Sequence, residues 1–322
     1  MTGGNRNLNK FGVSRNGVAC GEASAGVRRQ MSSFLASEVP RGAYTAMRTS
    51  RNRSAVFLLD FHKKRLVDSH RLLLAQDENS ASFSDPLTTS EERFLQLAVK
   101  SISACIYSLN EILDKDEVDR EAMITVVVTL SKPYEVHALA SLLPDFREGG
   151  VGVEVRTGPR SRPKAKDTQW AITRKQWENI RLPGVEETIL ADEDGHLLEG
   201  ATSNLFIFID DVLCTAPDVI LPGHVREVII DRVCPMLDIP VRMEAPTLES
   251  RSRWQGGFIT NARRLLDVVS FVKLPEKEGA QEVNLQTTQR TRQIRDALAT
   301  LVEDSSDPII RYEQYTSPQP KY

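Results

Sequence analysis

The chain has 322 residues, of which 40% are hydrophobic and 26% are charged, with a formal net charge of -3 at pH 7. This composition is typical of a soluble globular protein that is long enough for two hydrophobic cores, and the balanced charge gives no reason to expect a nucleic-acid partner. No uninterrupted apolar stretch is long enough to cross a bilayer, so we expect no membrane partner.

The cysteines, Cys20, Cys105, Cys214 and Cys234, are scattered and form no CxxC pair. This arrangement favours reduced thiols in a cytoplasmic location and argues against a zinc site, so no metal is expected. The alternative is an organellar location. Residues 1–31 are poor in acidic residues and contain several arginines, as short targeting peptides do.

The N-terminal segment is predicted to begin with disorder and then to form a hairpin. Residues 1–10 are rich in Gly and Asn and are predicted to be disordered. Asn16-Gly17 is typical of a two-residue turn between apolar residues, which predicts a β-hairpin over 11–19. Because a hairpin that belongs to the domain cannot be cleaved away, we favour this interpretation over a targeting peptide.

Between residues 40 and 157 the sequence alternates between strand and helix patterns. Short apolar runs rich in β-branched residues predict buried strands, and apolar residues at helical spacing predict amphipathic helices. Thr89 and Glu92 have the spacing of a capping box at the start of the longest helix. The predicted strands are 55–59, 123–129 and 151–156, the predicted helices are 61–74 and 89–113, and 135–143 is predicted to be a short helix or a loop.

A cluster of Gly and Pro residues marks the predicted boundary between two α/β units of similar size. A cleft between two domains is a common place for a cofactor, so we expect the binding site there. The predicted parts are a small α/β domain at 11–157, a linker at 158–163, a large domain at 164–303 and a polar C-terminal tail at 304–322.

The large domain contains a glutamate at the start of an apolar strand. The strand pattern at 187–192, the Asp194-Gly195 turn and the run from 198 to 209 predict a hairpin, and Asp210-Asp211 predicts a further turn into a third strand. A carboxylate that enters a buried strand requires a cation or a hydrogen-bond donor as its partner. The alternative is that Glu199 lies at an exposed bend.

A loop and a helix follow this predicted meander. Leu221-Pro-Gly-His-Val-Arg226 is predicted to be a tight turn that leads into a helix through about residue 233. A Gly-containing loop before a helix presents free N–H groups, which suits a phosphate. Gly223, His224 and Val225 are therefore candidate backbone ligands, and Arg226 is expected to pack or pair structurally.

Three of these segments together resemble one family. Glu199-Gly-Ala-Thr-Ser-Asn204, the loop at 221–226 and the lysine in Ala165-Lys-Asp-Thr-Gln169 are similar to motifs of the fold-type IV pyridoxal-phosphate enzymes. These class IV aminotransferases include branched-chain and D-amino-acid aminotransferases and aminodeoxychorismate lyase. The resemblance extends from Phe11 to about Asp267. It implies an α/β (α+β) fold with a barrel-like β core in the larger domain, pyridoxal 5'-phosphate as the cofactor, and a homodimer.

The resemblance assigns the cofactor lysine to Lys166. The chemistry requires an amine that forms a Schiff base and, once free, moves a proton at the substrate carbon. Lys166 is followed by Asp167-Thr168-Gln169, similar to the family pattern Lys-Ser/Thr-x-Asn. Lys164, two residues earlier on the same expected strand face, is the alternative.

The remaining cofactor contacts follow from the same resemblance. Glu199 is expected to hold a proton on the pyridine nitrogen. Arg65 lies in a pattern similar to the family's phosphate-binding helix, and a guanidinium offers paired donors to phosphate; the alternative is a solvated helix face. Thr260 and Asn261 resemble the second phosphate segment, although an ordinary capping role is the alternative for Thr260.

The expected reaction is transamination between an amino acid and a 2-oxo acid. The alternatives are β-elimination by a lyase of the same fold and a degenerate protein that only binds the cofactor. Tyr44 and Arg48 are candidates for the substrate pocket. Thr45 stands where the family has an acidic residue, and His224 replaces a more usual apolar residue.

Overall fold

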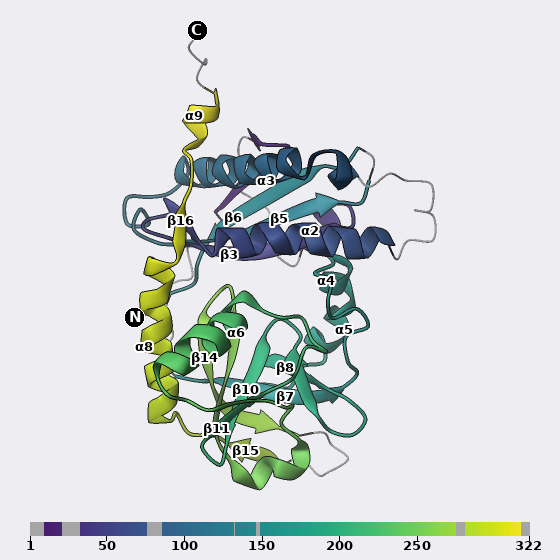
Figure 1. Cartoon of the computed structure of the whole chain (residues 1–322), viewed down its shortest axis with the longest axis vertical. Helices are drawn as coiled ribbons and strands as arrows, with labels where there is room; N and C mark the ends of the chain where they lie inside the picture. Colours follow the sequence, from purple (N-terminus) through teal and green to yellow (C-terminus); the bar gives the residue numbers. More distant parts are fainter. Residues whose placement is uncertain are drawn as a thin grey trace. The chain divides into compact units, whose positions relative to one another are not determined.

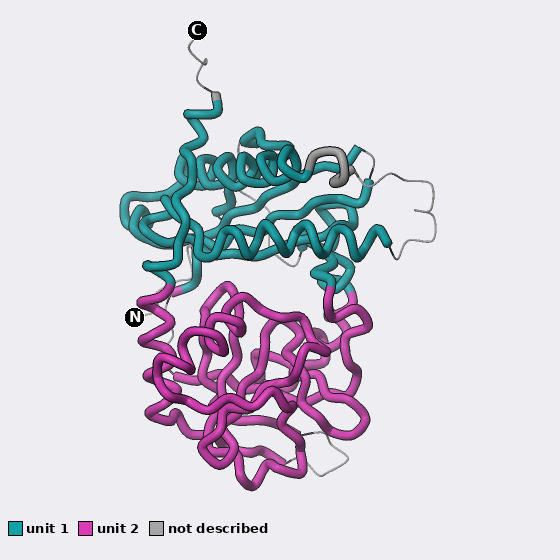
Figure 2. Tube along the Cα trace, viewed as in Figure 1, with its two compact units in different colours: residues 1–144, 165–172, 302–322 teal, residues 145–164, 173–301 magenta. Residues whose placement is uncertain are grey.

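The computed structural model describes residues 10–20, 33–75, 86–131, 133–145, 149–274 and 281–316. It divides into two compact units, which Figure 2 colours separately. Residues 1–9, which belong to the segment predicted to be disordered, lie outside the described residues. Unit 1 comprises 1–144, 165–172 and 302–322, and unit 2 comprises 145–164 and 173–301.

This division differs from the predicted domain boundaries in three segments. Residues 145–157 belong to unit 2, because their strand lies inside the second sheet. Residues 165–172 belong to unit 1, where they lie along its sheet. The C-terminal residues return to unit 1, and 306–308 form a strand there, although a polar tail is predicted at 304–322.

Unit 1 is built on a 7-stranded sheet with the order β16-β4-β3-β5-β6-β1-β2. Every neighbouring pair in this sheet is antiparallel. The strands are β1 (Phe11–Arg15), β2 (Val18–Cys20), β3 (Gly42–Ser50), β4 (Ala55–Phe57), β5 (Ala122–Thr129), β6 (Val136–Leu142) and β16 (Ser306–Pro308).

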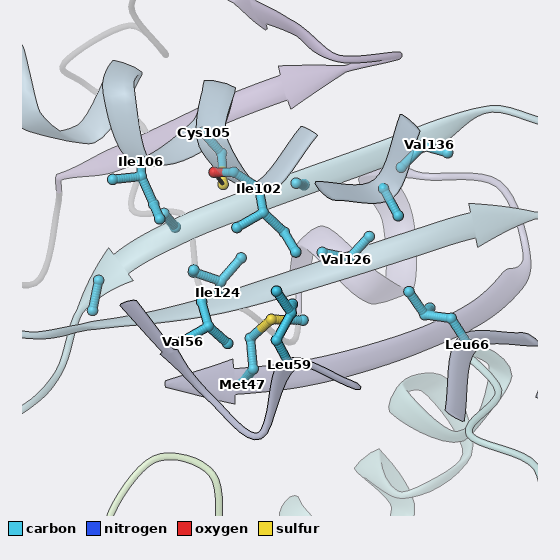
Figure 3. Close-up of a cluster of buried hydrophobic side chains, with 14 of the residues drawn as sticks. Met47, Val56, Leu59, Leu66, Ile102, Cys105, Ile106, Ile124, Val126 and Val136 are labelled. Carbon is cyan, nitrogen blue, oxygen red and sulfur yellow. Dashed lines mark hydrogen bonds between the residues drawn. The ribbon is translucent and has the colours of Figure 1, made fainter. Parts of the chain in front are cut away.

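Two long helices, α2 (Leu59–Ala75) and α3 (Pro86–Asn110), cover one face of this sheet (Figure 1). Leu66 of α2, Ile102 of α3 and Ile124 of β5 belong to the same cluster of buried side chains (Figure 3). Burying such apolar side chains is the main contribution to the stability of the unit. The π-helix η1 (Phe34–Glu38) contributes to a second cluster, and the short helix α9 (Tyr312–Thr316) follows β16.

The local predictions for unit 1 are mostly confirmed. Asn16 and Gly17 have φ angles of 50° and 72°, so they form the expected two-residue turn between β1 and β2. The prediction of a helix or loop at 135–143 is wrong. That segment is β6, which is paired on both sides by β5 and β1 and is largely buried, so its side chains lack the polar alternation of a half-exposed strand. α3 begins at Pro86, three residues before the start of the predicted capping box.

Unit 2 contains a β-barrel, as predicted. The 9-stranded sheet has the order β12-β11-β10-β13-β14-β7-β8-β9, and its ninth strand, β15, pairs with β14 outside this order. An additional pairing between β9 and β10 closes the ring. Its strands are β7 (Val151–Thr157), β8 (Val185–Ala191), β9 (Leu197–Gly200), β10 (Asn204–Ile209), β11 (Val212–Thr215), β12 (Val241–Met243), β13 (Trp254–Asn261), β14 (Leu265–Lys273) and β15 (Glu282–Asn284).

A helix begins at His224, directly after the loop at 221–223, as predicted. It runs without interruption through α6 (His224–Val228), the π-helix η3 (Ile229–Val233) and α7 (Cys234–Met236), so it extends past its predicted end. Pro235 lies in α7, and the helix ends one residue later at Met236. The other helices are α4 (Gln169–Thr173), α5 (Lys175–Glu178), the 3-10 helix η4 (Leu248–Arg253) and α8 (Gln289–Asp304).

No helix in the described part of the chain combines the length and the apolar character needed to cross a membrane.

Candidate functional site

The segment that carries Lys166 is held between β3 and α2 in unit 1. The carbonyl of Lys166 accepts a hydrogen bond of 2.9 Å from the N–H of Tyr44, and the N–H of Lys166 donates to Oγ of Ser69 at 3.1 Å. Ala43 and Asp167 form an isolated antiparallel bridge. The lysine backbone is therefore fixed on both sides, although the segment is not the regular strand that we expected.

The residues that follow the lysine strengthen this attachment. Oγ1 of Thr168 accepts from the N–H of Gly42, and the N–H of Thr168 donates to the carbonyl of Gly42, both at 3.0 Å. The carboxylate of Asp167 is buried and accepts from Nη2 of Arg41 at 2.8 Å and from Nε at 3.3 Å. It also accepts from the N–H of Gln169 at 2.9 Å, which closes a local turn.

The side chains of the two candidate lysines have different surroundings. Nζ of Lys166 lies 4.9 Å from the centroid of the Tyr44 ring, and Tyr44 is 5% exposed. Lys166 is half-buried, whereas Lys164 is exposed. A lysine amine that is partly withdrawn from water over an aromatic ring is better suited to form a covalent link than one in solvent.

Arg65 lies on α2, one turn before Ser69. Its guanidinium carbon is 4.5 Å from the centroid of the Phe61 ring, which restricts the orientation of the side chain. On the buried face of the same helix, Nδ1 of His62 lies 2.7 Å from Oγ1 of Thr45. Thr45 therefore faces the helix, and both residues are buried.

Tyr44 and Arg48 lie on the same face of β3, because alternate residues of a strand point to the same side. Nε of Arg48 is buried and has no hydrogen-bond partner among the described residues. Burial lowers the pKa of Arg48, and the charges of Glu121 and Glu303 act in the opposite direction.

Glu199 lies near the end of β9, at the seam that closes the barrel of unit 2. It pairs in register with Asn204 of β10 and with Leu190 of β8. The residue is 5% exposed, and its carboxylate accepts a hydrogen bond of 3.3 Å from the N–H of Leu221. The alternative of an exposed bend is therefore wrong.

Asn204 connects this seam to the loop before α6. Its Nδ2 donates to the carbonyl of Leu221 at 2.9 Å, and its Oδ1 accepts from the N–H of Gly223 at 3.0 Å. A Cβ at Gly223 would lie 2.1 Å from that oxygen, so a larger residue would displace the Asn204 amide from the loop. With the N–H of Gly223 already used, His224 and Val225 supply N–H groups of the first helical turn, which lack acceptors inside the helix.

Thr260 lies beside Asn204, because these residues are directly opposite each other in β13 and β10. Thr260 is 2% exposed, and its Oγ1 has no hydrogen-bond partner among the described residues. Buried hydroxyls are normally satisfied, so this one is a candidate for binding a ligand. Asn261 has a different local role, since its Oδ1 accepts from the N–H groups of Arg263 and Arg264, both at 3.0 Å.

Arg226 has the structural role that we expected. It is 2% exposed, its Nη2 donates to the carbonyl of Ala216 at 2.7 Å, and its Nη1 lies 3.7 Å from the carboxylate of Asp218. Burial lowers the pKa of Arg226, while Asp218 acts against this shift. The residue therefore fixes the loop between β11 and α6.

The structure groups the predicted residues by unit. Unit 1 holds Lys166, Arg65, Tyr44 and Arg48, and unit 2 holds Glu199, Gly223, His224, Val225, Thr260 and Asn261. Sequence reasoning did not assign the contact of Ser69 with Lys166 or the contacts of Glu187 with the bend after Glu199. A signal for Glu187 was available, since it is a charged residue two positions before the apolar end of β8, residues 189–191.

One group of side chains in the described residues, Asp192, Asp194 and His196, has potential metal-ligand atoms that all lie within 4.8 Å of one another. The carboxylate of Asp192 accepts from the N–H groups of Asp194 and His196 and contacts the His196 ring. These contacts are those of a turn at the surface and account for the group without an ion.

Comparison with known proteins identifies relatives along most of the chain. A model of the family described as amino-transferase class IV matches residues 42–271. A probable branched-chain-amino-acid aminotransferase from Rickettsia conorii is 26% identical over 145 residues, which cover 42% of this chain and 49% of that protein. The matched region thus spans about half the length of this curated relative.

Solved structures with the same fold cover nearly the whole chain. A branched-chain aminotransferase from Thermoproteus uzoniensis, solved with norvaline, has a TM-score of 0.67 and 20% identity, covering 94% of this chain and 100% of that chain. The PLP-bound form of a hypothetical aminotransferase from Mycobacterium tuberculosis has a TM-score of 0.64 and 16% identity, and the match covers 91% of this chain and 98% of that chain. At these identities the likeness shows the fold.

Proposed function

This chain belongs to the class IV aminotransferase family, and we propose that it transfers an amino group between an amino acid and a 2-oxo acid with pyridoxal 5'-phosphate as its cofactor. The observation that carries this proposal is the attachment of Lys166, whose backbone is bonded on both sides and whose amine lies over the Tyr44 ring. A fixed, half-buried lysine is the residue that this chemistry requires.

The phosphate of the cofactor fits the residues at the start of α6. The unpaired hydroxyl of Thr260 is a suitable donor to a phosphate, and His224 and Val225 place their backbone N–H groups in the first turn of α6, where a phosphate is favoured. Asn204 holds Gly223 close to this group through the 3.0 Å hydrogen bond. We propose that Arg65 adds a guanidinium contact to the same phosphate and that Asn261 shapes the adjoining turn.

Pyridoxal phosphate, when bound, supplies an aldehyde that links to amines and a pyridinium ring that accepts the electrons released at the substrate carbon. The amine of Lys166 holds the cofactor, and after release it removes the proton from the substrate Cα. Glu199 holds a proton on the ring nitrogen, for which its burial and its charge are suited. Tyr44 and Arg48 are proposed to line the pocket for the substrate.

We also propose a homodimer, as the family resemblance implies, and a cytoplasmic location. The cysteines Cys20, Cys105, Cys214 and Cys234 are free, which is compatible with a reducing compartment. Light scattering on the purified protein would measure the oligomeric state.

The first experiment is a visible spectrum of the protein mixed with pyridoxal phosphate, followed by borohydride reduction and peptide mapping. We expect an absorbance band in the visible range and a label on Lys166. A label on Lys164 would change the assigned residue but keep the enzyme class, and no band would contradict the proposal. A screen of amino donors and 2-oxo acids then measures transfer, while pyruvate release without an acceptor would identify a lyase.

A further inference from the structure

Glu187 is a buried carboxylate in β8 of unit 2 that lies against the bend between β9 and β10. It is 3% exposed. One carboxylate oxygen, Oε2, accepts from the N–H of Thr202 at 3.1 Å, from Oγ1 of Thr202 at 2.5 Å and from Oγ of Ser203 at 3.1 Å. The other, Oε1, accepts from the N–H of Thr188 at 2.9 Å and lies 3.4 Å from Nη2 of Arg181.

A carboxylate in this position is costly unless it is well paired, because burial removes its hydration. The hydrogen bonds that Glu187 accepts compensate for its lost hydration. All those accepted by Oε2 come from the bend between β9 and β10. Gly200 adds to this packing, since a Cβ there would lie 2.1 Å from Oγ of Ser203 and 3.1 Å from Cγ of Glu187. The bend therefore has little freedom to move.

The bend joins the two strands that close the barrel, and Glu199 directly precedes it. Gly200 and Ser203 exchange backbone hydrogen bonds of 2.8 and 3.4 Å across the bend. The path of the backbone at these residues sets the direction in which the Glu199 side chain leaves β9. The partners of Glu187 on the bend, Thr202 and Ser203, are three and four residues after Glu199, so a change in these contacts alters the backbone directly after Glu199.

We propose that Glu187 is a positioning residue for Glu199: it fixes the Gly200–Ser203 bend and thereby the orientation of the carboxylate that would hold the proton on the ring nitrogen of the cofactor. This inference rests on the role of Glu199 in the proposed function. The hydrogen bonds themselves, and the order that they give to the bend, do not depend on that role.

The same barrel offers a matched control. Glu154 of β7 is 1% exposed and is also a paired carboxylate, which accepts from Arg156 at 3.2 Å, from the N–H of Leu182 at 3.1 Å and from Oγ1 of Thr188 at 3.4 Å. Its described hydrogen bonds do not include the bend. A Glu154→Gln variant therefore reproduces the loss of a buried charge while every hydrogen bond from the bend to Glu187 is kept.

The test begins with Glu187→Gln in the cofactor-free protein. Glutamine has an NH2 group in place of one carboxylate oxygen. In either orientation of the side chain, this NH2 group faces one of the two sets of donors and cannot accept their hydrogen bonds. We expect hydrogen exchange in the segment 200–203 to become faster by about tenfold or more, because a hydrogen bond to a charged group is lost. The Glu154→Gln variant should leave this segment unchanged, and equal effects of the two variants would overturn the proposal.

The second readout is a double-mutant cycle with the cofactor and substrates present. Glu187→Gln should lower kcat by about ten- to a hundredfold while KM changes little, because it misplaces a group that acts in the reaction. In a Glu199→Gln background the same substitution should have almost no further effect on kcat. Additive losses would show that Glu187 does not act through Glu199.

A variant on the bend side covers the case in which Glu187→Gln does not fold. Thr202→Val removes one hydroxyl contact and leaves Glu187 paired with Arg181. It should produce a smaller effect in the same direction in both readouts, and an unchanged exchange rate in 200–203 would contradict the proposal. If the wild-type chain forms no reducible link with pyridoxal phosphate, the proposed function fails, and the exchange measurement still decides whether Glu187 orders the bend.

Discussion

At the scale of single residues, Lys166 carries the clearest prediction. Lys166→Ala should abolish the borohydride-trapped label and lower amino transfer by at least about a thousandfold, because Lys166 is the amine that we propose to hold the cofactor and to move the proton. The measurement is a mass-spectrometric peptide map together with a steady-state assay. Lys164→Ala is the matched control, since Lys164 is exposed and should retain both the label and most of the activity.

Thr260 gives a second prediction at this scale. Thr260→Val keeps the size of the side chain and removes a hydroxyl that has no protein partner among the described residues. We expect cofactor affinity to fall by about tenfold, as for the loss of one hydrogen bond to a charged group, while the free energy of unfolding without cofactor stays the same or rises slightly. Fluorescence titration with pyridoxal phosphate measures the first quantity and denaturant unfolding the second.

The control for this experiment comes from unit 1. Thr125 of β5 is also buried, and its Oγ1 likewise lacks a hydrogen-bond partner in the described part of the chain. Thr125→Val should not change cofactor affinity. If both valine variants weakened binding equally, the assignment of Thr260 to the phosphate would be wrong.

At the scale of elements, the Lys166 segment depends on its attachment to β3. Asp167→Ala removes the acceptor for Arg41 and for the N–H of Gln169, and it should lower the free energy of unfolding by about 1–2 kcal/mol. Capture of pyridoxal phosphate by Lys166 should also slow, because the lysine backbone is less fixed. Denaturant unfolding and the rate of absorbance change measure these effects.

Asp60→Ala is the control for that variant. Asp60 forms an ion pair with Lys63 at the surface of α2, and its side chain is 86% exposed. Exposed pairs contribute little to stability, so this variant should behave like the wild type in both measurements. A capture rate that is normal in Asp167→Ala would show that the attachment does not serve the lysine.

The loop before α6 shows how elements far apart in sequence form one site. Asn204 of β10 bonds to Leu221 and Gly223, and Thr260 of β13 stands opposite it. The register of the barrel strands therefore brings together Glu199, the loop before α6 and the unpaired hydroxyl of Thr260. A change in any of these strands should affect the others through the shared asparagine.

At the scale of the whole molecule, the dependence of stability on pH can be traced to a contact near the N-terminus. Glu117 is 1% exposed and lies 2.6 Å from Nζ of Lys10. Burial raises the pKa of Glu117, but the hydrogen bonds from Lys10 and from the N–H of Asp114 outweigh it, so the pKa lies below its usual value. A carboxyl with a lowered folded-state pKa contributes stability above its unfolded pKa and loses it as the pH falls through the folded pKa.

Glu117→Gln should therefore lower the free energy of unfolding at pH 7 by on the order of 1 kcal/mol, and the difference from the wild type should shrink as the pH falls below about 4. Denaturant titrations of both proteins at pH 7 and at pH 3 measure this difference in the free energy of unfolding. A difference that stayed constant between these pH values would mean that the contribution of Glu117 is steric and not electrostatic.

Features with a local cause were already determined by the sequence. The Asn16-Gly17 turn was correct because its backbone angles are set by the two residues themselves. The meander that contains Glu199 and the glycine before α6 were correct for the same reason, since turn residues and apolar runs act over a few positions.

Only the tertiary structure decided the features that depend on pairing between segments far apart in the sequence. Residues 136–142 form a strand because β1 and β5 flank them, and 165–172 join unit 1 because they bond to β3. The unpaired hydroxyl of Thr260 and the contacts of Glu187 with the bend arise where strands meet in the closed barrel. No sequence window contains both partners of such contacts, since the physical cause is the register of strands that are distant in the chain.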